Sequence, residues 1–199
     1  MGKRAAHFLA LVGALLAGCH PPPDDVAPSV YVGALGADGD ASLAVAVQDG
    51  YVAVYACGSD SARDAYPRWV STGTYTDESH VTLTRGQWRF DGAWGGATAS
   101  GALVGPDGVA MPWSGIAARP GSLDGLYAAL DSGCMSGVIV MNGDSAPVVR
   151  GAWCDAAGDV RQINPILPLT LEGTRLAVEV AAGAAPRRLN VAPVRLPMP

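Results

Sequence analysis

The stretch ASLAVAVQDGYVAVYAC, residues 41–57, decides the predicted fold of this chain. Its first half places Leu43, Val45 and Val47 on one face of an extended strand, because side chains alternate between the two faces of a β-strand. The letters QDG then supply a turn, and residues 51–57 run back as a second alternating segment. An Asp-Gly pair between two such segments is a strong local signal, so we predict a β-hairpin here.

Other segments of the chain carry the same kind of pattern. Residues 80–85 (HVTLTR) and 175–180 (RLAVEV) alternate cleanly, whereas residues 137–142 (GVIVMN) are apolar on both faces, as in a central strand. Residues 60–66 fit a short helical turn, and no long apolar stripe of helical period is present. Turn-forming residues interrupt the chain every eight to twelve positions. We therefore predict an all-β fold, an antiparallel meander of short strands that closes into a barrel or a sandwich.

The length of the chain bounds the number of domains. With 199 residues, the chain suits a single β domain, which we place at residues 29–199. Residues 42–64 and 137–159 share a rhythm of strand, turn, strand, cysteine and polar loop. Two related hairpin halves are one interpretation of this rhythm. A chain of this size can bury a core of its own, so we expect no cofactor.

The charge of the chain bears on its partners. The formal net charge is −5, Lys3 is the only lysine, and the arginines form no basic run. Binding to nucleic acid depends on clustered Lys and Arg side chains that neutralise phosphates. We therefore expect no nucleic-acid partner.

The N-terminus has the pattern of an export signal. Lys3 and Arg4 precede ten largely apolar residues, 8–17, whereas a helix that spans a bilayer needs about 20. The next letters, Leu16 to Cys19 (LAGC), resemble the lipobox of bacterial lipoproteins, in which two small residues stand before a cysteine. An ordinary secretory signal with a chance cysteine is the alternative interpretation.

The resemblance to the lipobox implies a location for the protein. Residues 1–18 would be a signal peptide, and Cys19 would become the N-terminus and carry the fatty acyl chains that bind the membrane. Two or three chains give stable anchoring where one gives only marginal binding. His20 stands at the second mature position, where aspartate marks inner-membrane retention in the best-known lipoproteins. The expected location is therefore the outer membrane in preference to the inner one.

The residues after Cys19 read as a tether. Residues 19–28 hold four prolines and two adjacent aspartates. Proline-rich segments are extended and semi-rigid, so this segment would hold the β domain away from the membrane.

A second resemblance concerns the start of the β domain. Residues 31–60, YVGALGADGDASLAVAVQDGYVAVYACGSD, resemble a group of uncharacterised secreted β-domains of high-GC bacteria. The resemblance implies β structure and carries no implication for activity.

The sequence offers weak signals for catalysis. His80 is the only histidine beyond residue 20, and it directly follows Asp77, Glu78 and Ser79. Adjacent residues of an extended chain point to opposite faces, so this run cannot assemble a triad by proximity in sequence. A nucleophile motif G-x-S-x-G is also absent. We predict an exposed polar loop with a solvated histidine and assign no catalytic residue.

The sequence gives equally weak signals for a metal site. The loops ADGDAS, residues 37–42, and DAAGD, residues 155–159, do not match a calcium loop, which needs more oxygen ligands at set positions. No two cysteines or histidines have zinc-ligand spacing. Aspartate and glycine are what turns require, so we predict turns and assign no metal.

The best candidate for recognition is QWRFDGAW, residues 87–94. Trp88, Phe90 and Trp94 share one face if the segment is a continuous strand. An exposed row could stack on sugar rings, but burial in a core is the commoner fate of large aromatic side chains. We predict that Trp88 and Phe90 are core, with a ligand platform of all three residues as the alternative. Gly92 could instead mark a bulge that splits the row.

Two functions follow from these observations. The first is a non-enzymatic envelope lipoprotein, a binding or structural module whose partner is an envelope protein or a glycan. The second is a hydrolase of an envelope polymer such as glycan. Two carboxyl groups ~5–10 Å apart in a cleft would support this function. We favour the first, because the sequence shows no catalytic constellation. The candidate acids of the second are Asp38, Asp77, Glu78, Asp91 and Asp131.

The remaining cysteines predict a disulfide. With Cys19 acylated, Cys57, Cys134 and Cys154 remain, and an exported compartment is oxidising. A hairpin around residues 143–145 would place Val140 opposite Val148 and Cys134 opposite Cys154, within reach of a bond. We predict the pair Cys134–Cys154, with Cys57 as the alternative partner if the register differs.

Overall fold

The computed structural model describes residues 27–77, 80–131, 133–143, 145–181 and 185–198. The predicted signal peptide, Cys19, His20 and most of the predicted tether lie outside these residues. Among the described residues, no helix is long and apolar enough to cross a membrane.

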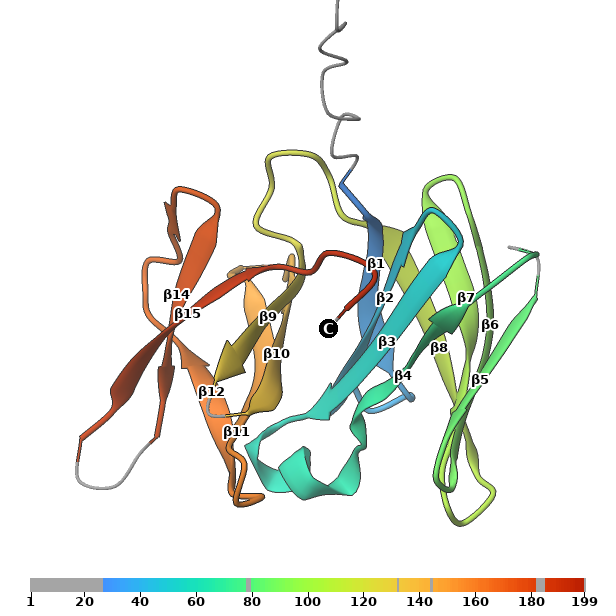
Figure 1. Cartoon of the computed structure of the whole chain (residues 1–199), viewed down its shortest axis with the longest axis horizontal. Helices are drawn as coiled ribbons and strands as arrows, with labels where there is room; N and C mark the ends of the chain where they lie inside the picture. Colours follow the sequence, from blue (N-terminus) through green and yellow to red (C-terminus); the bar gives the residue numbers. More distant parts are fainter. Residues whose placement is uncertain (1–26, 78–79, 132, 144, 182–184, 199) are drawn as a thin grey trace, which may run out of the picture.

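The described chain forms two antiparallel sheets, each of which curls into a barrel (Figure 1). The all-β prediction is therefore confirmed, and closure takes the barrel form twice. The first barrel is built from β1 (Ser29–Leu35), β2 (Ala41–Gln48), β3 (Tyr51–Gly58), β4 (Arg68–Thr74), β5 (Val81–Arg85), β6 (Trp88–Gly95), β7 (Thr98–Val104) and β8 (Ala110–Ala117). The second is built from β9 (Gly125–Asp131), β10 (Cys134–Met141), β11 (Val148–Cys154), β12 (Val160–Pro165), β13 (Leu171–Glu172), β14 (Arg175–Val180) and β15 (Arg187–Pro193).

The hairpin predicted from residues 41–57 is present as β2 and β3. The strands pair from Ala41 and Gly58 to Gln48 and Tyr51, which leaves a two-residue connection. Its residues, Asp49 and Gly50, have φ angles of 50° and 79°. Two positive φ angles define the type I′ turn that matches strand twist, which explains the Asp-Gly pair.

The first barrel has a strand order of β4-β3-β2-β1-β8-β7-β6-β5. Its end strands, β4 and β5, lie beside each other without a backbone ladder. A side chain bridges them instead, since Arg85 donates from Nη1 to the carbonyl oxygen of Trp69 at 2.7 Å. The predicted inward residues of β5, Val81 and Leu83, are buried inside this barrel.

The second barrel closes fully. Its strand order is β12-β11-β10-β9-β15-β14-β13, and β12 also pairs with β14 through Ile163 and Val180. The alternating residues predicted for 175–180 fill its interior, together with Val138 and Val140 from β10.

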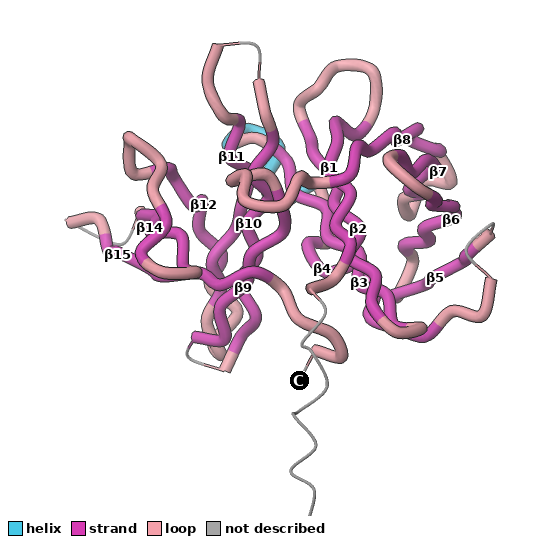
Figure 2. Tube along the Cα trace, turned by 90° about the horizontal axis from the view of Figure 1, so that it is seen from above, coloured by secondary structure: helices cyan, strands magenta, loops and turns pink. Residues whose placement is uncertain are grey.

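The two barrels lie side by side and share a third buried cluster (Figure 2). The first barrel contributes mostly small side chains to it, including Ala44, Ala46 and Ala53. Small side chains let the backbones of the two sheets approach closely, and this explains why β2 is buried on both faces. The predicted central strand, β10, is likewise apolar on both faces and contributes Ile139 to the same cluster.

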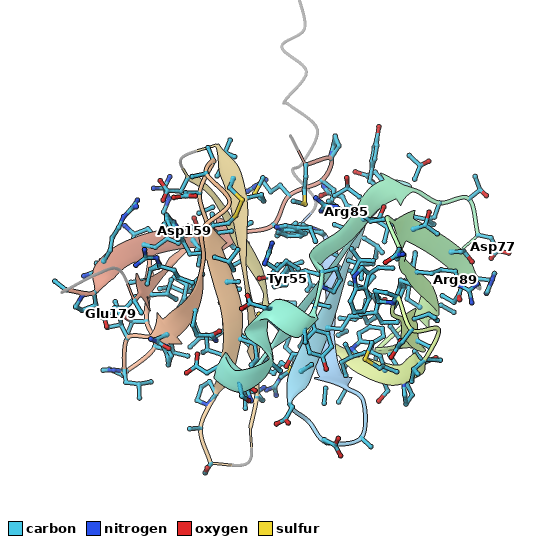
Figure 3. The ribbon with its side chains drawn as sticks, turned by 90° about the horizontal axis from the view of Figure 1, so that it is seen from below. Tyr55, Asp77, Arg85, Arg89, Asp159 and Glu179 are labelled. Carbon is cyan, nitrogen blue, oxygen red and sulfur yellow. A yellow bond between two sulfur atoms is a disulfide. The ribbon has the colours of Figure 1, made fainter. Side chains whose placement is uncertain are left out.

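Tyr55 of β3 stands at the centre of this interface and is fully buried (Figure 3). Its hydroxyl donates to the carbonyl oxygen of Gly137 at 2.9 Å and accepts from the backbone N–H of Ala152 at 3.1 Å. Burial is the first cause that raises the pKa of Tyr55 well above its usual value. The neutral hydroxyl therefore joins the first barrel to two strands of the second.

The disulfide joins Cys134 to Cys154, as predicted, with Cα atoms 5.6 Å apart. Cys57 is buried outside this bond. The predicted hairpin register is wrong by one residue, because Val140 lies opposite Val149 rather than Val148.

The disulfide survives the shift because the ladder between β10 and β11 ends at Gly137 and Ala152. Beyond it, the N–H of Cys154 bonds to the hydroxyl of Ser136 at 3.2 Å instead of to a backbone carbonyl. The two strands depart from regular pairing there, so strict alternation no longer decides which side chains can meet.

The predicted helical turn is a 3-10 helix, η1 (Asp60–Ala65), which follows β3. It lies between the barrels and beside β11 in both views (Figures 1 and 2).

Candidate functional site

The aromatic row of β6 is part of the core. Trp88, Phe90 and Trp94 lie on one continuous strand, and Phe90 is 0% exposed and Trp94 6% exposed. Trp88 is half-buried and packs against the same interior cluster. The prediction of a core role is therefore supported by the burial of these rings, and the alternative of an exposed ligand platform does not hold. The barrel closes over the face that these residues share.

Gly92 does not split this row. β6 pairs with β5 and β7 without interruption through Gly92. A methyl group on Gly92 would meet the ring of Phe90 at 2.5 Å, so the glycine makes room for that ring.

His80 lies in an exposed polar group on β5 and β6. Its Nε2 is 3.4 Å from the hydroxyl of Thr82, and this hydroxyl donates to Asp91 at 2.8 Å. Arg89 also pairs with Asp91 at 2.7 Å. A hydroxyl has one proton, and here it is directed to Asp91 rather than to the histidine. This order differs from a nucleophile–histidine–carboxylate triad, in which the histidine stands between the other two.

The candidate acids of the hydrolase hypothesis are distributed over both barrels. Asp91 is paired on β6, and Asp131 on β9 binds Arg187 and the indole N–H of Trp153. Asp38 lies in the loop after β1, and Asp77 lies at the outer edge of the first barrel (Figure 3). Glu78 lies outside the described residues.

The aspartate-rich loops behave as turns. Asp155 Oδ1 accepts the backbone N–H groups of Ala157 and Asp159 at 2.9 and 3.0 Å. Within the described residues, no group of three or more His, Cys, Asp or Glu side chains is placed to hold a metal ion.

The strongest candidate site is a groove of about 880 Å³ between the two barrels. Its floor is the outer surface of the first barrel, formed by β1, β7 and β8. The hydroxyls of Thr98, Ser100 and Ser114 stand there in a cross-strand arrangement, with Ser100 opposite Ser114 and Thr98 opposite Ile116. Ile116 is 70% exposed and adds an apolar surface between them. The floor therefore offers hydroxyl groups beside one large aliphatic side chain.

Three polar side chains stand at the edge of this groove. Asp124 and Arg119 belong to the connection between the barrels, and Asn142 follows β10. Asn142 donates from Nδ2 to Asp124 Oδ2. The other carboxylate oxygen, Oδ1, is buried and has no hydrogen-bond partner among the described residues. An unpaired buried carboxylate oxygen costs free energy, so a donor supplied by a ligand would stabilise this end of the groove.

The connection that carries these residues is ordered by its own hydrogen bonds. The N–H of Ala118 bonds to the carbonyl oxygen of Val30 at 2.7 Å. A turn follows, in which the hydroxyl of Ser122 donates to the carbonyl oxygen of Arg119 at 2.9 Å. Asp124 then stands directly before β9, where its position is fixed by the start of the strand.

The negative charge of Asp124 affects a tyrosine of the second barrel, Tyr127. The hydroxyl of Tyr127 donates to the carbonyl oxygen of Leu123 at 2.9 Å. Burial, and secondarily the charge of Asp124, raise the pKa of Tyr127 above its usual value. The groove thus ends in a carboxylate whose negative charge acts on the buried phenol of Tyr127.

The sequence did not point to the polar residues at the edge of the groove. Arg119, Asp124 and Asn142 come from separate positions that no motif links, and each would be read alone as an ordinary loop residue. The one usable signal was the run ARPGSLDG, residues 118–125, which interrupts the strand pattern for longer than a hairpin turn requires.

The fold and the groove together define an all-β protein of two adjoining barrels with a groove between them, whose largely apolar lining carries a few polar side chains. Comparisons with protein-family models, with curated proteins and with solved structures found no match.

Proposed function

We propose that this protein is a lipid-anchored, non-enzymatic binding module of the bacterial cell envelope, and that the groove between its barrels takes a hydroxyl-rich ligand such as a glycan segment. The observation that carries the proposal is the unpartnered oxygen of Asp124 at the end of a groove lined by hydroxyl groups. The proposed anchor is the acylated Cys19, and the proposed location is the outer membrane.

The chemistry of the groove suits a glycan. Each sugar hydroxyl is both a donor and an acceptor, and the groove offers a carboxylate acceptor, an arginine donor and an amide that does both. Ile116 and the small residues of the floor can cover the apolar C–H face of a sugar ring. The groove volume of about 880 Å³ lies within the range of small-molecule sites, ~300–1,000 Å³.

The disulfide is consistent with export. Bonds of this kind form and persist in oxidising compartments such as the periplasm and are rare in the cytosol. The pair Cys134–Cys154 therefore supports a site of action outside the cytosol.

A binding role is favoured over hydrolysis by the charges of the groove. Asp124 is the carboxylate among its described lining residues. Glycoside hydrolysis commonly requires two carboxyl groups about 5–10 Å apart on either side of the bond that breaks.

Replacing Asp124 with alanine is expected to weaken glycan binding by about 10- to 100-fold, because a hydrogen bond to a charged group contributes ~1.5–3 kcal/mol. The measurement is binding to an array of bacterial envelope glycans, followed by titration of the glycan that binds best. Glu179→Ala on β14, in the second barrel away from the groove, is the matched control and should bind as the native chain does. Equal binding by the Asp124 variant, or no binding by the native chain, would refute the groove assignment. Release of reducing sugar from the bound glycan would favour the hydrolase.

Substitution of Cys19 by alanine is expected to abolish acylation. Metabolic labelling with a fatty acid should mark the native chain and leave the Cys19→Ala precursor unlabelled and uncleaved. Cys57→Ala, at a cysteine buried in the barrel interface, should keep the label. A labelled Cys19→Ala protein would show that the lipobox assignment is wrong.

A further inference from the structure

A second pocket lies between η1 of the first barrel and β11 and β12 of the second, on the side where Figures 1 and 2 place η1 beside β11. Its volume is about 360 Å³. Its polar lining consists of Asp60 from η1, Arg150 from β11, and Gln162 and Asn164 from β12. The groove between the barrels shares none of these residues.

Two polar atoms of the residues that line this pocket are buried and lack hydrogen-bond partners in the part of the chain that the structure describes. They are Nε of Arg150, a donor, and Oε1 of Gln162, an acceptor. Gln162 is only 8% exposed, so solvent at the surface does not reach most of its side chain. Buried polar groups in native proteins are nearly always paired, and leaving one unpaired costs free energy. An unpaired donor and an unpaired acceptor on side chains that line the same pocket indicate a ligand that supplies the complementary groups.

The strand register places these two side chains near each other. Gln162 lies directly opposite Ala152, which is two residues from Arg150 on β11. Arg150 and Gln162 are therefore diagonal neighbours on one face, with backbones about 7–8 Å apart. This face is turned towards the first barrel, because Ala152 belongs to the buried cluster that the two barrels share.

The charges around the pocket define the ligand further. Arg150 forms no ion pair with any described residue, and its planar guanidinium matches a carboxylate in a bidentate arrangement. Asp60 is exposed at the rim, where its negative charge disfavours a ligand with two negative charges. The amide oxygen of Gln162 accepts an N–H group.

We propose that this pocket binds the C-terminal end of a peptide or an N-acylated amino acid. The carboxylate of the ligand binds the guanidinium of Arg150, and the adjacent amide N–H of the ligand donates to Oε1 of Gln162. A single carboxylate beside an amide N–H is the chemistry that every peptide C-terminus carries. This site is separate from the proposed glycan groove and does not depend on it.

The experiment is a calorimetric titration of the full-length chain, kept in mild detergent, with N-acetylalanine. Saturable binding is expected, and Arg150→Gln should weaken it by about 10- to 100-fold, because charge-assisted hydrogen bonds to the carboxylate are lost. Gln162→Leu should also weaken binding, since it removes the acceptor at similar size. Arg175→Gln, at an exposed arginine of β14 outside the pocket, is the matched control and should leave binding unchanged.

The choice of probes separates the proposal from simpler explanations. N-acetylalaninamide lacks the carboxylate, and inorganic phosphate lacks the N–H group and carries more negative charge. Both are expected to bind at least about tenfold more weakly than N-acetylalanine. Equal binding of all three probes, or no saturable binding of N-acetylalanine at tens of millimolar, would overturn the proposal. A crystal structure with saturating N-acetylalanine in which water alone contacts Arg150 Nε and Gln162 Oε1 would also overturn it.

Discussion

Replacing Tyr55 with alanine is expected to lower the free energy of unfolding by at least about 4 kcal/mol. Removing a buried aromatic ring costs ~3–5 kcal/mol through lost packing and the cavity that remains. The carbonyl oxygen of Gly137 and the N–H of Ala152 also lose their partner, and each unsatisfied buried group costs ~1–3 kcal/mol unless water enters. Chemical denaturation followed by tryptophan fluorescence measures the effect.

Two further variants separate the ring from the hydroxyl. Tyr55→Phe keeps the ring, which packs against Trp69 with centroids 4.7 Å apart, and removes only the two hydrogen bonds. It should therefore lie between the native chain and the alanine variant. Tyr51→Phe, at a tyrosine that is 39% exposed on the same strand, should change the stability by less than about 0.5 kcal/mol. A Tyr55→Ala protein as stable as the Tyr51 variant would mean that the interface contributes little to folding.

The same substitution should also reveal how the two barrels depend on each other. If they fold as one cooperative unit, Tyr55→Ala should shift a single transition to lower denaturant concentration. If the interface is the weaker part, the variant should show two transitions, because each barrel keeps its own interior cluster.

Loss of the disulfide is the second large effect. The double substitution Cys134→Ala and Cys154→Ala is expected to destabilise the fold by roughly 3 kcal/mol in the chain-entropy model. The bond closes a segment with a sequence separation of 20, and breaking it enlarges the conformational freedom of the unfolded chain. The measurement is equilibrium denaturation under oxidising conditions.

Reductant supplies the control for this prediction. It should destabilise the native chain by about the same amount and leave the double variant unchanged. Cys57 is buried outside the bond, so a contribution from it would appear as a response of the double variant to reductant. An unchanged midpoint for the reduced native chain would show that the disulfide does not constrain the unfolded state.

The sequence by itself determined the local structure of this protein. The hairpin of β2 and β3, the inward residues of β5 and β14 and the helical turn at η1 all follow from alternation and turn chemistry. These signals are local, since each depends on residues within one strand or one turn. The disulfide between Cys134 and Cys154 could also be predicted from the sequence, because both cysteines belong to one hairpin.

The register of that hairpin was decided by tertiary structure. The loop between Met141 and Val148 is longer than the three-residue turn assumed from the sequence. The ladder then ends early, where the Ser136 hydroxyl replaces a backbone acceptor. A hydroxyl that substitutes for a carbonyl leaves no signature in the alternation of the chain, so the sequence could not show it.

The fate of the aromatic row was decided in the same way. Alternation placed Trp88, Phe90 and Trp94 on one face, but it could not say whether that face would meet solvent or a core. Closure of the first barrel through β1 and β8 turned this face inward. The other face of a barrel strand is then the outer surface, which is where the groove formed.

Both candidate sites depend wholly on tertiary structure. The groove unites Asp124 before β9 with Asn142 after β10 and the hydroxyls of β7 and β8, and the second pocket unites η1 with β11 and β12. Each site lies where two barrels meet, so its residues come from segments far apart in the chain. Hydrophobic alternation reports the burial of one strand at a time, whereas the meeting of two closed surfaces depends on how both barrels pack around Tyr55.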